Sequence, residues 1–99
     1  MDISIQSLGF DADKKLVEFV KSKAAKLSKI SDDILMAEIT LRLENTQTDE
    51  NKIAELKLDI PKNNIFAKKQ AKSFEEAFDS VVNAVKPQLK KRKGKIRGI

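Results

Sequence analysis

Polar and apolar residues alternate along three short segments of the chain, which is the pattern of a half-buried β-strand. The clearest alternation lies between positions 35 and 43, where every second residue is apolar: Leu35, Ala37, Ile39, Leu41 and Leu43. Residues 54–60 repeat this pattern after a polar stretch, so the two segments are predicted to form a hairpin. Alternation at residues 3–6 and a short segment at residues 65–70 predict two further strands.

Two other segments place apolar residues three or four positions apart, as an amphipathic helix does. The first begins after Asp13, a predicted N-cap, and runs to about Leu27. The second begins at Ser73 and Glu76, which match the capping-box pattern. Its apolar stripe consists of Phe74, Ala77, Phe78, Val81, Val82, Val85 and Leu89. Pro87 lacks the N–H that a helix interior needs, so a kink or a break is predicted there, and Gly94 is expected to end the helix.

The resulting order β-α-β-β-β-α predicts an α+β fold, a two-layer sandwich of a four-stranded sheet with two helices on one face. This topology is like that of a double-stranded-RNA-binding domain. The last three strands should form an antiparallel meander, and the first should pair parallel with the second through a right-handed crossover. Because 99 residues with 40% hydrophobic content suffice for one core, we expect a single domain at residues 1–93 and a short basic tail at residues 94–99.

Basic residues concentrate near the C-terminus. The net charge is +5, yet residues 86–99 contain seven basic residues and no acidic residue, which leaves 13 basic against 15 acidic residues before them. The seven are Lys86, Lys90, Lys91, Arg92, Lys93, Lys95 and Arg97. Such asymmetry predicts a polyanionic partner. The alternative is a solubilising tail without a specific function.

The composition argues against several other classes of function. Without cysteine or histidine the chain lacks disulfides, thiolate and imidazole metal ligands, and the commonest acid–base catalyst, so we expect neither an enzyme nor a cofactor nor a small-molecule substrate. The adjacent Asp32 and Asp33 are interpreted as a turn or strand cap. The longest apolar run has four residues, against about 20 for a membrane span. The N-terminus does not resemble a secretion signal, so a cytoplasmic location without a membrane partner is expected.

The order of elements and three local stretches resemble the ribosome hibernation promoting factor family, also called the sigma-54 modulation protein family. The stretches are LVEFVKSKAAKL at residues 16–27, IFA followed by FEEAFD at residues 65–67 and 74–79, and QLKKRK at residues 88–93. The resemblance implies binding to the small ribosomal subunit, mainly to 16S ribosomal RNA, near the decoding region, which silences translation in resting or stressed cells. Long members also carry a domain for ribosome dimerisation, so the resemblance implies a short form.

Carried over by position, the resemblance implies RNA contacts on and after each helix. These contacts are Lys23, Lys26, Lys29, Lys90, Lys91 and Lys93, and the neighbouring basic residues Lys86, Arg92 and Lys95 are further candidates. The chain departs from the family pattern at Ala84 and Pro87, where relatives tend to carry basic residues. Lysine and arginine side chains neutralise phosphates and release counterions, which gives sequence-independent, salt-sensitive affinity.

Two other functions remain open. A protein interaction module could use an exposed sheet face carrying Met36, Ile53 and Phe66. A general double-stranded RNA binder would share the fold order. Phe66 points away from Ile65 and Ala67 on its predicted strand, and we interpret it as a packing residue, with base stacking as the weaker alternative. Steep salt dependence would separate RNA binding from apolar association, and competition with free duplex would separate the two RNA targets.

Overall fold

The computed structural model has the predicted order of strands and helices. The elements are β1 (Asp2–Leu8), α1 (Lys14–Ala25), a short 3-10 helix η1 (Lys26–Lys29), β2 (Met36–Leu43), β3 (Lys52–Asp59), β4 (Ile65–Ala71) and α2 (Phe74–Arg97). The structure describes the backbone of residues 1–97 and the side chains of residues 1–91. The helix predicted to reach about Leu27 is therefore α1 continued by η1.

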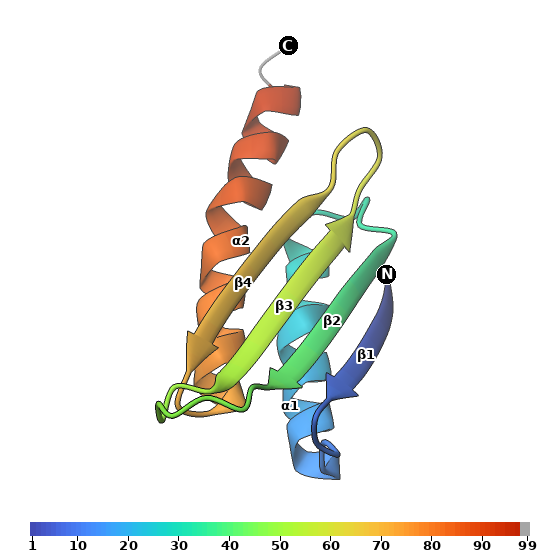
Figure 1. The fold of residues 1–99 in the computed structure, drawn as a ribbon. Helices are drawn as coiled ribbons and strands as arrows, with labels where there is room; N and C mark the ends of the chain where they lie inside the picture. The colour runs from blue at the N-terminus through green and yellow to red at the C-terminus, as the bar shows by residue number, and fades with distance from the viewer. Residues whose placement is uncertain (98–99) are drawn as a thin grey trace.

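The four strands form one sheet in the order β1-β2-β3-β4. β1 pairs parallel with β2, so that Ile5 lies opposite Ile39. β2 with β3 and β3 with β4 pair antiparallel, as a meander does. Both helices lie on the same face of the sheet (Figure 1). The predicted two-layer α+β sandwich is confirmed.

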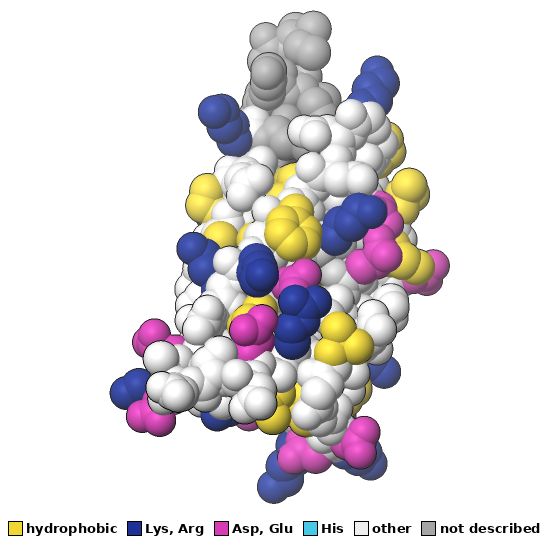
Figure 2. Space-filling model, viewed as in Figure 1, with side chains coloured by type: hydrophobic (Ala, Val, Ile, Leu, Met, Phe, Trp, Pro, Cys, Tyr) yellow, Lys and Arg dark blue, Asp and Glu magenta, His cyan; other side chains and the backbone are white. Residues whose placement is uncertain are grey.

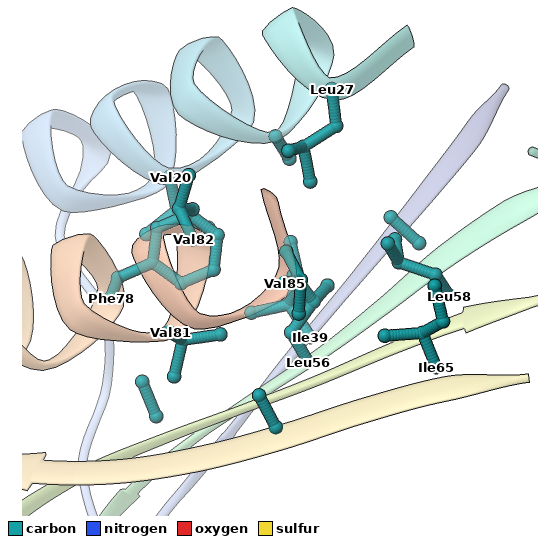
Figure 3. Close-up of a cluster of buried hydrophobic side chains, with 14 of the residues drawn as sticks. Val20, Leu27, Ile39, Leu56, Leu58, Ile65, Phe78, Val81, Val82 and Val85 are labelled. Carbon is teal, nitrogen blue, oxygen red and sulfur yellow. The ribbon is translucent and has the colours of Figure 1, made fainter. Parts of the chain in front are cut away.

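The core fills the space between the sheet and the two helices. Its largest side chains without solvent exposure come from α2, η1 and the central strands, and include Phe78, Leu27, Leu41, Leu56 and Leu58. Val20 of α1 faces Phe78 and Val82 of α2 in this cluster (Figure 3). The helices therefore pack on each other as well as on the sheet, which fixes the spacing between them.

Both helices begin at the predicted caps. The Asp13 carboxylate accepts a hydrogen bond of 2.8 Å from the backbone N–H of Leu16. The Ser73 hydroxyl accepts one of 3.1 Å from the backbone N–H of Glu76. Each bond satisfies a donor in the first helical turn that has no partner within the helix.

Two predictions about the second helix are wrong. α2 is not broken at Pro87 and does not end at Gly94, because it continues to Arg97 as one helix (Figure 1). Pro87 and Asn83, whose carbonyl loses its N–H partner, are both exposed, so water can hydrogen-bond that carbonyl. The proline is therefore accommodated on the solvent side of the helix.

Two predictions about sheet residues are also wrong. Leu35 was expected to be buried, yet it precedes β2 and its exposed fraction is 63%. Its neighbour Ile34 enters the core instead. Ile53 was expected to be exposed, yet it is buried on the outer face, with Arg42 and Gln70 opposite it on the adjacent strands. The apolar surface required for the interaction-module alternative is accordingly smaller than expected.

Candidate nucleic-acid interface

The two helices hold the candidate RNA contacts on one layer of the molecule. α1 and α2 run in the same direction along the sheet, so that their C-terminal ends point the same way (Figure 1). An ion pair of 2.9 Å joins Lys23 Nζ of α1 to Asp79 Oδ1 of α2. This contact establishes which side of each helix faces the other.

Helical spacing then places the remaining lysines. Lys86 and Lys90 follow Asp79 by 7 and 11 residues, so all three lie on the side of α2 that faces α1. Lys26 and Lys29 lie in η1, directly after α1. Lys26, Lys29, Lys86 and Lys90 therefore all lie on the C-terminal side of the Lys23–Asp79 pair, after α1 and in the second half of α2, and we call these four residues the basic end.

The basic end is positively charged and open to solvent. Lys26, Lys29 and Lys90 are exposed, and Lys86 is half-buried. Within the part of the chain whose side chains are described, none of the four forms an ion pair with a carboxylate. Lys26 and Lys29 also interact favourably with the carbonyls at the C-terminal end of α1 and η1, so the fold tolerates their charge there. A polyanion could bind here without displacing a protein carboxylate.

Lys23 has different surroundings from the basic end. Its ammonium group is held by Asp79 and lies 5.6 Å from the centre of the Phe19 ring. The carboxylate partly neutralises its charge, and the contact joins α1 to α2. Asp79 was not among the predicted site residues, because its partner is 56 positions away and no sequence period indicates such a pair.

The other predicted contacts are only partly described. Lys91 is exposed on α2 but lies about a third of a turn from the stripe that contains Lys86 and Lys90. Arg92, Lys93 and Lys95 lie on the backbone of α2, and their side chains fall outside the described residues. Their role in binding RNA stays a prediction.

The outer face of the sheet has no excess charge on β2, β3 and β4. It carries three basic side chains, Arg42, Lys57 and Lys68, and three acidic ones, Glu38, Glu55 and Asp59. Most of them form ion pairs: Arg42 lies 3.3 Å from Glu55 and Lys57 lies 3.8 Å from Glu38, both across β2 and β3, and Lys57 also lies 3.8 Å from Asp59 on its own strand. Figure 2 shows the two signs interspersed on this face. The outer face is therefore a weaker site for a polyanion than the basic end.

The remaining candidate sites are few in the described part of the chain. The Ser31 hydroxyl donates a 2.5 Å hydrogen bond to Asp33, which agrees with the interpretation of that loop as a cap. Among the described residues no cluster of three or more carboxylates could hold a metal ion. None of the described helices is both long and apolar enough to span a bilayer.

Comparisons with known proteins show the family to which the chain belongs. Residues 3–97 match the family model described as "Sigma 54 modulation protein / S30EA ribosomal protein". This description names a modulation protein and a ribosomal protein, and no enzyme. No curated protein matches the chain.

Two solved structures have a similar fold. A ribosomal subunit interface protein from Coxiella burnetii has a TM-score of 0.83 and 21% identity, with 95% of this chain and 99% of that chain covered. The N-terminal domain of Protein Y from Thermus thermophilus has a TM-score of 0.78 and 23% identity, with 92% and 98% covered. Because the family model spans nearly the whole sequence and the fold agrees, the chain belongs to the sigma 54 modulation protein / S30EA ribosomal protein family, as the sequence resemblance indicated.

Proposed function

We propose that this protein is a ribosome hibernation factor. It binds the small ribosomal subunit near the decoding region, mainly through 16S ribosomal RNA, and silences translation in resting or stressed cells. The observation that carries the proposal is the basic end, whose four lysines lie on two packed helices beyond the Lys23–Asp79 pair and have no carboxylate partners among the described side chains. Membership of a family described as ribosomal supports the ribosome as the target, and a cytoplasmic location follows from that target.

The chemistry of the basic end suits structured RNA. Lysine ammonium groups act as point charges that neutralise phosphates without reading bases. Helical RNA is recognised mainly through its shape and backbone, which a fixed pair of helices can follow. The packing of Val20 against Phe78 and Val82 holds this pair at a constant spacing. A rigid basic surface loses little conformational entropy on binding.

Translation would be silenced because the protein occupies its binding site on the small subunit. A folded domain seated near the decoding region would exclude messenger and transfer RNA from the same space. This mechanism requires no chemical step. Release would require only that the electrostatic contacts be outcompeted.

The test is co-sedimentation with purified small ribosomal subunits at low and high salt and constant Mg²⁺. Two double variants carry the same change in charge: Lys90→Glu with Lys91→Glu near the basic end, and Lys14→Glu with Lys15→Glu in the first turn of α1. The wild type should pellet stoichiometrically at low salt and much less at high salt. The first double variant should fail to pellet, and the second should pellet like the wild type.

Several results would contradict the proposal. If the wild type stays in the supernatant at low salt, the protein is not a small-subunit ligand. If both double variants lose binding equally, total charge matters and the basic end does not. If an excess of free duplex RNA releases the protein, it is a general double-stranded RNA binder.

A further inference from the structure

Phe66 is an aromatic side chain that the core does not use. It is the second residue of β4, and its exposed fraction is 55%. It pairs with Lys57 on the outer face of the sheet, whereas its neighbours Ile65 and Ala67 point into the core. Phe66 is not one of the buried residues of the core cluster. Its ring is therefore accessible to a binding partner.

Ile53 shows that the same face can cover an apolar side chain. Its exposed fraction is 3%, although it also points away from the helices. Arg42 and Gln70 lie opposite it, and both are held in place: Arg42 by Glu55, and Gln70 by a hydrogen bond from its side-chain amide to the Glu50 carbonyl. No comparable cover lies over Phe66, so more than half of its side-chain surface stays in water.

The surroundings of Phe66 carry charges of both signs and are open on one side. Lys57 lies opposite Phe66 and is paired with Glu38 and Asp59. Lys68 follows two residues later on the same face, opposite Glu55. Among the described residues no carboxylate lies within ion-pair distance of Lys68. β4 is an edge strand, so a chain can approach the ring from outside the sheet. β4 also starts at the end of the sheet toward which the C-terminal end of α2 points (Figure 1).

We propose that Phe66 is a stacking platform for an unpaired base of the bound RNA, with Lys68 neutralising a neighbouring phosphate. The inference rests on the proposed function and adds a second contact on the opposite face of the molecule. An aromatic ring next to lysine is the combination that binds single-stranded nucleic acid, because every base has a face that can stack. A protein partner would favour a continuous apolar patch, but the cross-strand neighbour of Phe66 is charged.

The test compares Phe66→Ala, Phe66→Leu and Phe66→Trp in titrations with small ribosomal subunits over a series of salt concentrations. The alanine and leucine variants should bind about 5- to 150-fold more weakly, since neither side chain can stack. The tryptophan variant should keep its affinity, and its fluorescence should change on binding, because the chain contains no other tryptophan. The alanine variant should leave the slope of log affinity against log salt unchanged. Lys68→Gln should lower this slope by the value expected for about one phosphate contact.

Leu35→Ala is the matched control, because Leu35 is similarly exposed but lies outside β4. It should leave affinity unchanged. If the Phe66→Ala variant binds like the wild type, the stacking inference is overturned and the proposed function is not affected. If the Phe66→Leu variant binds as tightly as the Phe66→Trp variant, the stacking inference is also overturned, because an apolar contact with a ribosomal protein would then be sufficient to explain the affinity. Failure of the wild type to bind would instead overturn the proposed function, on which the inference rests.

Discussion

Lys23 and Lys26 are one helical turn apart, yet their side chains have different surroundings. Lys23 is paired with Asp79, whereas Lys26 is exposed and has no carboxylate partner among the described side chains. A phosphate that binds Lys23 must compete with the carboxylate. The two lysines look equivalent in the sequence, and the difference arises from the packing of α1 on α2.

This difference predicts unequal salt effects. Lys26→Gln should lower the slope of log affinity against log salt by about 0.7 to 0.9, the value for one phosphate contact. Lys23→Gln should change the slope by less, because its charge is already partly neutralised. Titrations with small subunits measure both slopes. Equal reductions would show that the Lys23–Asp79 pair opens when RNA binds.

Gly9 is required by the backbone after β1. Its φ is +85°, and an added Cβ would lie 2.8 Å from the Leu43 carbonyl oxygen. Gly9→Ala should therefore lower the free energy of unfolding by at least about 1–2 kcal/mol, measured by urea denaturation. Ser4→Ala, on the exposed side of β1, is the control and should have little effect. Identical urea midpoints for the Gly9 variant and the wild type would contradict this account.

At the scale of elements, α2 contains a proline, which destabilises the interior of a helix. Pro87 lies inside the helix and leaves the Asn83 carbonyl without an intrahelical partner. Pro87→Ala should raise the free energy of unfolding by up to about 3 kcal/mol, since the lost hydrogen bond is restored and the ring clash is removed. Thermal or urea denaturation measures the gain. Destabilisation would show that the proline is needed where it is.

The elements themselves were predictable because their signals are local. The alternation of polar and apolar residues predicted strands, and the N-cap residues Asp13 and Ser73 predicted where the two helices begin. Burial at individual positions was less predictable, because it depends on tertiary neighbours. Ile34 enters the core ahead of β2 and leaves Leu35 exposed. The cover over Ile53 comes from strands β2 and β4, which no window of sequence contains.

The candidate site was predictable to the same extent. The lysines of the basic end were identified from the charge distribution and the family resemblance. Their relative placement and the Lys23–Asp79 pair were not, because both depend on how two helices pack across 50 or more residues. The continuation of α2 past Pro87 was not predictable, because it depends on the solvent exposure of that turn, which the sequence does not show.

At the scale of the whole molecule, charge is distributed unevenly over the two layers. On the outer face of the sheet, β2 to β4 carry equal numbers of basic and acidic side chains, and most of these form ion pairs. The helix layer carries the basic end, whose four lysines have no carboxylate partner among the described side chains. Such a molecule should approach a polyanion in one orientation, because the attractive potential is concentrated at one end. Binding should then occur at one position on the subunit.

Chemical footprinting of 16S RNA in small ribosomal subunits tests this central claim most directly. The wild type should protect nucleotides of the decoding region, the Lys14 and Lys15 double variant should give the same protections, and the Lys90 and Lys91 double variant should give none at the same concentration. Binding of the wild type without protection there, or protection spread over the subunit surface, would contradict the account.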